Sequence, residues 1–276
     1  MRSLRLATLI LLASAAQASA TARPATPPDL VVRAAASRMA MLPAGTYRPL
    51  YAPVGKSRIA VAAFALDREA VTRGEFLAFV TRQPEWQRGR VRAVFADARY
   101  LADWRGALDA GEAEALRRPV TEVSWFAARA YCASLGKRLP TVDEWEYAAA
   151  ASERSADASA DPSFRARLLA LYGSMRGPSS AATRGFTNVY GLRALHGVIW
   201  EWTLDFNSVV LDDDSRATGS GADARDRHLY CASSAIGATD PSDYAAFLRY
   251  AVRAGLGARS TTSSVGFRCA ADAPVS

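Results

Sequence analysis

The three cysteines, Cys132, Cys231 and Cys269, are the side chains of this sequence that could carry redox or nucleophilic chemistry. A thiolate attacks electrophiles and binds soft metals such as copper(I). An odd number leaves one thiol over if the other two form a disulfide. Such a thiol has two interpretations, which the residues alone leave open: a small buried side chain, or a nucleophile.

Histidine chemistry is limited by number, because the chain contains only His196 and His228. Two histidines exclude a three-histidine metal site. They also disfavour an iron site built from two histidines and one carboxylate.

The first twenty residues are typical of a cleaved secretory signal. Arg2 and Arg5 form a basic start, residues 6–13 are apolar, and residues 18–20 are an A-x-A cleavage signal. The alternative is a membrane anchor, but the apolar run is shorter than the ~20 residues that a spanning helix needs. We therefore expect a signal peptide over residues 1–20, export to a bacterial periplasm, and no membrane segment in the mature protein. The Ala/Pro/Thr-rich residues 21–37 are predicted to be a flexible leader.

The remaining chain is long enough to bury one sizeable core. It belongs to a sequence of 276 residues, of which 50% are apolar, and no long linker divides it. We predict one domain over residues 38–272. The net charge is +7, but the arginines are scattered rather than gathered in a stripe. A nucleic-acid partner is disfavoured because such proteins present a clustered basic face.

Helix start signals locate the elements that must position any site. Thr72 and Glu75 form a capping box, which predicts a helix to about Arg82. A second capping box, Thr141 with Glu144, predicts a helix to about residue 151.

Three further helices are expected outside the capping boxes. Ser124 is predicted to cap a helix through Leu135, with Gly136 just beyond its end. Asp240 is predicted to cap a helix with Pro241 at its first position and Tyr244, Phe247 and Leu248 on it. A short helical piece is expected over residues 164–171. Strands are predicted over residues 39–46 and 59–66, and residues 84–118 are predicted to be packed but irregular.

Five blocks, taken in order, resemble the formylglycine-generating-enzyme (sulfatase-modifying factor) family. They are Met41–Thr46, Asp67–Phe76, Pro119–Ala150, Asn188–Thr203 and Gly266–Ala270. The second block is similar to the family's D…VTN.xF pattern, the fourth to N.fGL.dm.GNvWEWt. The resemblance implies an α+β fold of irregular, C-type-lectin-like architecture with little regular secondary structure. It also implies that Cys132 and Cys269 form a structural disulfide.

The resemblance also implies a copper(I) site made of two cysteines a few residues apart, and here the sequence departs from the pattern. Residues 230–240 hold one cysteine, Cys231. In one register the second cysteine is replaced by Ile236, and in the other both are lost. Copper is therefore not expected. Cys231 remains a candidate catalytic residue, or a buried one.

Fewer calcium ligands are present than the family pattern implies. Val198 stands where the pattern has Asn in GNvWEW, and Ala194 stands at the expected Asn/Asp of the dm step. Glu201 is kept and is a weak candidate calcium ligand. A single carboxylate is few for an ion that takes 6–8 oxygens, and the alternative is that Glu201 forms hydrogen bonds inside the fold.

Residues 84–101 and 235–244 resemble the NirV-type branch, whose members accompany copper nitrite reductases in denitrifying bacteria. Periplasmic PvdO-like proteins, which act in siderophore maturation, are a second relative, whereas the His-rich extra domain of ergothioneine-type iron enzymes is absent from this sequence. We hypothesise an exported accessory or maturation factor that serves a protein or small-molecule client. Two alternatives stay open: an active oxidase acting on a protein cysteine, and a lectin-like binding module. The sequence does not decide whether the protein is an enzyme.

Overall fold

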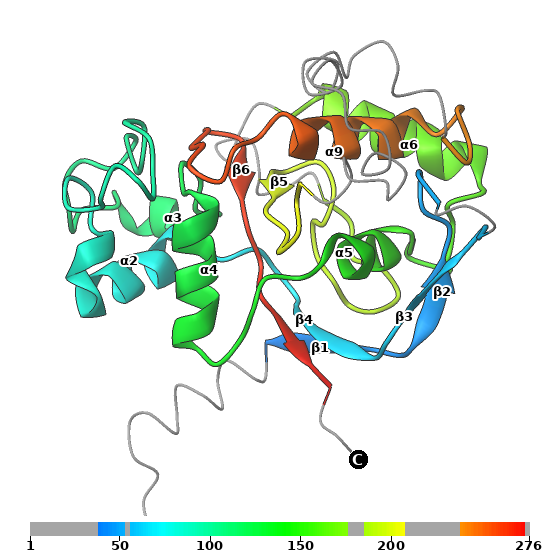
Figure 1. The fold of residues 1–276 in the computed structure, drawn as a ribbon, viewed down its shortest axis with the longest axis horizontal. Helices are drawn as coiled ribbons and strands as arrows, with labels where there is room; N and C mark the ends of the chain where they lie inside the picture. The colour runs from blue at the N-terminus through cyan, green and yellow to red at the C-terminus, as the bar shows by residue number, and fades with distance from the viewer. Residues whose placement is uncertain (1–37, 53–55, 176–184, 208–237, 274–276) are drawn as a thin grey trace, which may run out of the picture.

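The computed structural model describes residues 38–52, 56–175, 185–207 and 238–273, and it combines helices with small sheets (Figure 1). The expected mixture of helix and strand with modest regular structure is confirmed. The sheets are short: β1 pairs antiparallel with β4 and β4 with β7, β2 pairs antiparallel with β3, and β5 pairs parallel with β6. Their bounds are β1 Met39–Leu42, β2 Gly45–Tyr47, β3 Ile59–Val61, β4 Phe64–Asp67, β5 Trp200–Glu201, β6 Val265–Gly266 and β7 Ala270–Asp272.

Each of the two predicted strands is divided in the structure. The first becomes β1 and β2, because Pro43 between them has no N–H with which to continue a ladder. The second becomes β3 and β4. Leu42 pairs with Phe64 at one end of the β1–β4 ladder, and β7 adds to the other side of β4. The C-terminal segment therefore completes the sheet that the N-terminal strand begins.

Both capping boxes are confirmed. The N–H of Thr72 donates to Glu75 at 2.9 Å at the start of α2, and the N–H of Thr141 donates to Glu144 at 2.9 Å at the start of α5. Gly136 adopts φ +67° after α4, a conformation that favours glycine beyond a helix end. The helices are α2 Arg73–Arg82, η1 Pro84–Trp86, α3 Ala113–Leu116, α4 Trp125–Ser134, α5 Val142–Ala149, α6 Pro162–Gly173 and α9 Tyr244–Ala254. None of the helices described is long and apolar enough to cross a bilayer.

A disulfide lies inside the largest apolar cluster, between α4 and the strand segment before β7. The Sγ atoms of Cys132 and Cys269 are 2.00 Å apart, and both residues are fully buried beside the rings of Phe76, Tyr131 and Phe267. The pairing agrees with the one that the family resemblance implies. With a separation of 137 residues, the bond lowers the entropy of the unfolded chain by an amount worth ~4–5 kcal/mol.

A fully buried ion pair connects β5 to the C-terminal segment. Arg268 donates from Nε and Nη2 to the two carboxylate oxygens of Glu201, at 2.8 and 2.9 Å. Trp145 of α5 donates its indole N–H to the same carboxylate at 2.8 Å. The remaining Arg268 donors reach the backbone carbonyls of residues 67, 68 and 193. Four separate segments are thereby held around one guanidinium, and each of these polar groups has a partner, as burial requires.

The helix α9 begins three residues later than the sequence predicted, and its buried face is charged. Asp243, not Asp240, is the N-cap, and its carboxylate accepts from the N–H of Ala246 at 2.9 Å. Arg249 and Arg253 point inward and bind Glu146 of α5, at 2.7 and 2.6 Å. Of the large apolar side chains predicted on this helix, Tyr244 is 62% exposed and Leu248 38%, whereas Phe247 is partly buried against the cluster that contains Tyr250.

A chain of hydrogen bonds leads from this charged cluster to His196. Arg249 donates to the hydroxyl oxygen of Tyr172 at 3.2 Å, and that oxygen lies 2.7 Å from His196 Nδ1. The second ring nitrogen lies 3.0 Å from the carbonyl of Ala149. These partners fit a neutral ring protonated at Nε2. Burial, with the positive charge of Arg249 adding to it, lowers the pKa of His196 to about 3.

We predict that Glu201→Gln destabilises the fold by about 3 kcal/mol, or roughly 10 °C in Tm, because it leaves Arg268 buried without a counter-charge. Thermal unfolding measures the effect. Glu114→Gln is the matched control, since Glu114 pairs with Arg118 while its side chain is 85% exposed, and it should change Tm little. Equal losses in the two variants would contradict a structural role for the Glu201–Arg268 pair.

His196 predicts a loss of stability in acid. Its pKa in the folded protein lies below the unfolded value, so between pH 6.5 and about 3 the unfolded state binds the extra proton. Stability should therefore fall by about 1.4 kcal/mol per pH unit below pH 6.5. Urea unfolding of the wild type and of His196→Gln at pH 7.5, 6.5, 5.5 and 4.5 measures this contribution as a difference. The variant should be less stable at pH 7.5 and show a smaller decline below pH 6.5. Parallel declines would show that His196 does not cause the acid sensitivity.

Candidate functional site

The structure accounts for two of the three cysteines as a disulfide, and the third candidate, Cys231, lies outside the described residues. Because the sequence holds three cysteines, the bond between Cys132 and Cys269 leaves Cys231 as the single remaining thiol of the chain. A copper(I) centre of two thiolates needs two such groups. The residues of one chain therefore do not fit that centre, whatever position Cys231 takes.

Glu201, the weak candidate calcium ligand of the sequence analysis, has a carboxylate that is engaged by protein side chains. Its carboxylate lies in the interior, where it accepts from Arg268 and from the indole of Trp145. A divalent cation bound there would sit beside the guanidinium, whose like charge repels it. The alternative that the sequence raised, a hydrogen-bonded role inside the fold, is the observed one, with side-chain donors rather than backbone. Among the residues described, no cluster of three or more His, Cys, Asp or Glu side chains could hold a metal ion.

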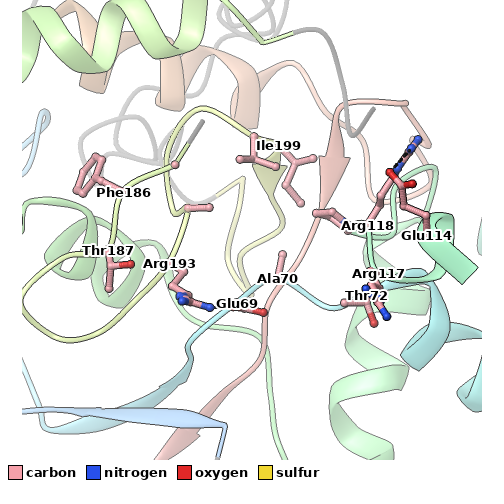
Figure 2. Close-up of a pocket in the computed structure, with 14 residues that line it drawn as sticks. Glu69, Ala70, Thr72, Glu114, Arg117, Arg118, Phe186, Thr187, Arg193 and Ile199 are labelled. Atoms are coloured by element: carbon pink, nitrogen blue, oxygen red, sulfur yellow. Dashed lines mark hydrogen bonds and ion pairs between the residues drawn. The ribbon is translucent and has the colours of Figure 1, made fainter. Parts of the chain in front are cut away.

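Ala194 and Val198, the two positions at which the family resemblance implied polar calcium ligands, lie together on the wall of a cavity. This cavity has a volume of about 620 Å³ (Figure 2). Ala194 has φ +49°, a conformation that Asn and Asp adopt more readily than alanine. The backbone at this position thus has a conformation that suits a short polar residue, while the side chain is a methyl group. The described lining residues are Glu69, Ala70, Thr72, Glu114, Arg117, Arg118, Pro119, Gly185, Phe186, Thr187, Arg193, Ala194, Val198 and Ile199.

The cavity has an apolar part and a charged part. Figure 2 shows Phe186 and Thr187 on the side opposite Arg117 and Arg118, with Ile199 and Ala70 between them. The apolar part is kept in place by packing, since Ile199 and Val198 are almost fully buried. The ring of Phe186 stacks on His196. Phe186 therefore connects the cavity to the hydrogen bonds that run from His196 through Tyr172 to Arg249.

Two of the three arginines at the cavity are paired with carboxylates. Arg193 lies 2.9 Å from Glu69, and Arg118 lies 3.3 Å from Glu114. Arg117 is exposed and forms no ion pair within the part of the chain that the structure describes. Three guanidinium groups against two carboxylates leave the lining with one excess positive charge. The described lining holds no cysteine or histidine, and its ionisable side chains are these two carboxylates and three arginines.

Sequence reasoning did not find this cavity. Its residues come from five separated stretches, and most are ordinary surface types whose spacing carries no signal. The available clue was that this sequence departs from the family resemblance at both Ala194 and Val198, which line the cavity.

The family model for the sulfatase-modifying factor enzyme 1-like domain matches residues 19–273 of this chain. The chain is 33% identical over 186 residues to the inactive C-alpha-formylglycine-generating enzyme 2 of Bos taurus, covering 62% of this chain and 57% of that protein. It is 33% identical over 177 residues to the formylglycine-generating enzyme of Streptomyces coelicolor, covering 56% and 53%. It is 34% identical over 161 residues to the hercynine oxygenase of Mycolicibacterium smegmatis, covering 52% and 37%. The chain thus spans little more than half the length of the first two of these curated relatives.

Solved structures with similar folds include PvdO from Pseudomonas aeruginosa, at 17% identity and a TM-score of 0.43 over 85% of this chain and 94% of that one. Another is CarF, at 14% identity and a TM-score of 0.42 over 85% and 98%. The order of the motifs and the match of the family model over most of the chain agree. This chain belongs to the formylglycine-generating-enzyme, or sulfatase-modifying factor, family.

Proposed function

We propose that this protein is an exported accessory factor of its family, which assists the maturation of a client without forming formylglycine at a two-thiolate copper site. The observation that carries the proposal is the Cys132–Cys269 disulfide, which removes two of the three cysteines from any metal site. The remaining thiol, Cys231, cannot by itself form a copper(I) site of two thiolates within one chain. The predicted signal peptide over residues 1–20 supports export. The disulfide agrees with it, because disulfides persist in oxidising compartments.

The relatives are compatible with loss of the standard activity, although they do not decide it. At about one third identity the chain matches both an enzyme named inactive and one named for formylglycine generation. The residues themselves separate the active from the inactive case better, because activity of the standard type depends on a pair of cysteines. In one register of the resemblance this chain has Ile236 at the second cysteine position, and in the other register it has neither cysteine. The NirV-type resemblance favours a client within a copper nitrite reductase system, and this remains a proposal about the partner.

Copper(I) binding tests the proposal directly. Purified wild-type protein, Cys231→Ser and Ile236→Cys are reconstituted with copper(I) without oxygen, and bound metal is measured after competition with a copper(I) chelator. We expect far less than one equivalent in the wild type and in Cys231→Ser, because one thiolate is a weak copper(I) site. Ile236→Cys should gain about one copper per chain if Cys231 stands at the first cysteine position of the pattern.

A parallel assay asks whether a cysteine-containing sulfatase peptide is oxidised to an aldehyde in the presence of copper and oxygen. The wild type should give none above the Cys231→Ser background. Stoichiometric copper in the wild type that is abolished by Cys231→Ser, together with aldehyde formation, would overturn the accessory role and favour the oxidase. Thermal unfolding of each variant confirms that a missing signal does not come from a missing fold.

A further inference from the structure

The cavity between Phe186 and Arg117 is shaped for a ligand with two unlike ends. Its volume of about 620 Å³ lies in the range of small-molecule sites in proteins. One part is lined by the methyl and ring groups of Phe186, Ala194, Val198 and Ile199. Removing such an apolar surface from water is favourable, so binding of an apolar group that covers it is favoured.

The opposite part of the cavity selects for negative charge. Glu69 and Glu114 are each engaged by an arginine, so neither is free to attract a ligand cation. The hydroxyl of Thr72 is also committed, because it donates to Glu75 and accepts from the N–H of the same residue in the capping box. Arg117 remains as the donor group without an ion-pair partner among the described residues. A planar guanidinium matches the two oxygens of a carboxylate.

Two observations disfavour a metal ion in this cavity. Ala194 and Val198 on the cavity wall have no side-chain atoms that could bind a cation. The lining as a whole has an excess of arginine over carboxylate, which repels cations. The same two residues add to the apolar wall.

From this arrangement we infer that the cavity binds a carboxylate attached to an apolar body, with the carboxylate at Arg117 and the apolar body against Phe186 and Ile199. Such a group occurs both in a free aliphatic or aromatic acid and at the C-terminus of a peptide that ends in apolar residues. This site does not involve Cys231, so the inference goes beyond the accessory role and does not depend on it.

The test uses three probes that share one body: 4-phenylbutyrate, the uncharged 4-phenylbutanol and the cationic 4-phenylbutylamine. Ligand-detected NMR and calorimetry measure their affinities for the full-length mature protein. A tripeptide acetyl-Gly-Leu-Phe with a free C-terminal carboxylate, and the same peptide as its amide, distinguish the two sources of the carboxylate. We expect the acid to bind more tightly than the alcohol, and the amine not to bind.

Two variants connect the binding to the cavity. Arg117→Gln should weaken 4-phenylbutyrate binding about tenfold, the effect of losing one charge-assisted hydrogen bond, and leave the alcohol unchanged. Ala70→Leu should weaken both the acid and the alcohol, because it fills the middle of the cavity while keeping its charge. Arg90→Gln is the matched control, an exposed arginine that does not line the cavity.

The outcomes separate clearly. Binding of the acid alone supports a small-molecule ligand, and binding of the free-carboxylate peptide over its amide supports a peptide C-terminus. Either result supports the site provided that Arg117→Gln weakens it and Arg90→Gln does not. Equal affinity for acid and amine, equal effects of the two arginine variants, or no binding of any probe at millimolar concentration would overturn the inference. Tm values of all variants establish that each is folded.

Discussion

The buried ion pair between Glu201 and Arg268 is the constraint on which the rest of this structure depends. Removing two charges from water costs several kcal/mol for each, and the cost is offset only where every donor and acceptor is satisfied. Here the carboxylate takes the indole N–H of Trp145 as well as the guanidinium, and the guanidinium also reaches three backbone carbonyls. Segments distant in sequence must therefore meet in one arrangement, in which β5 lies beside β6.

This constraint also determines what surrounds the Glu201 carboxylate. Its two oxygens are occupied by Arg268 and by the indole N–H of Trp145. A few residues earlier in the chain, Ala194 and Val198 line the cavity. Next to Trp145, whose indole binds Glu201, Glu146 fixes α9 through Arg249 and Arg253. Burial raises the pKa of Glu146, but the two arginines outweigh that effect and lower it to about 2.

Local signals in the sequence predicted local structure well. The capping boxes at Thr72 and Thr141 fix helix starts because the side chain and the backbone N–H that it satisfies are three residues apart. The inward face of α9 was not predictable in the same way, because arginine is normally exposed and its burial depends on Glu146, more than a hundred residues earlier. The cavity was missed for the same reason, as it arises only where separated stretches meet. The cysteine reasoning succeeded partly: the bond between Cys132 and Cys269 is present, while Cys231 lies outside the described residues.

The disulfide makes one large covalent ring of the chain. Its separation of 137 residues encloses Glu146, His196, Glu201 and Arg249, so most of the buried polar side chains described above belong to that ring. A protease that cuts one peptide bond between Cys132 and Cys269 opens the ring without releasing a fragment. The nicked protein keeps its full mass until a reductant reaches the bond, and both pieces stay at the high effective concentration that favours their continued association.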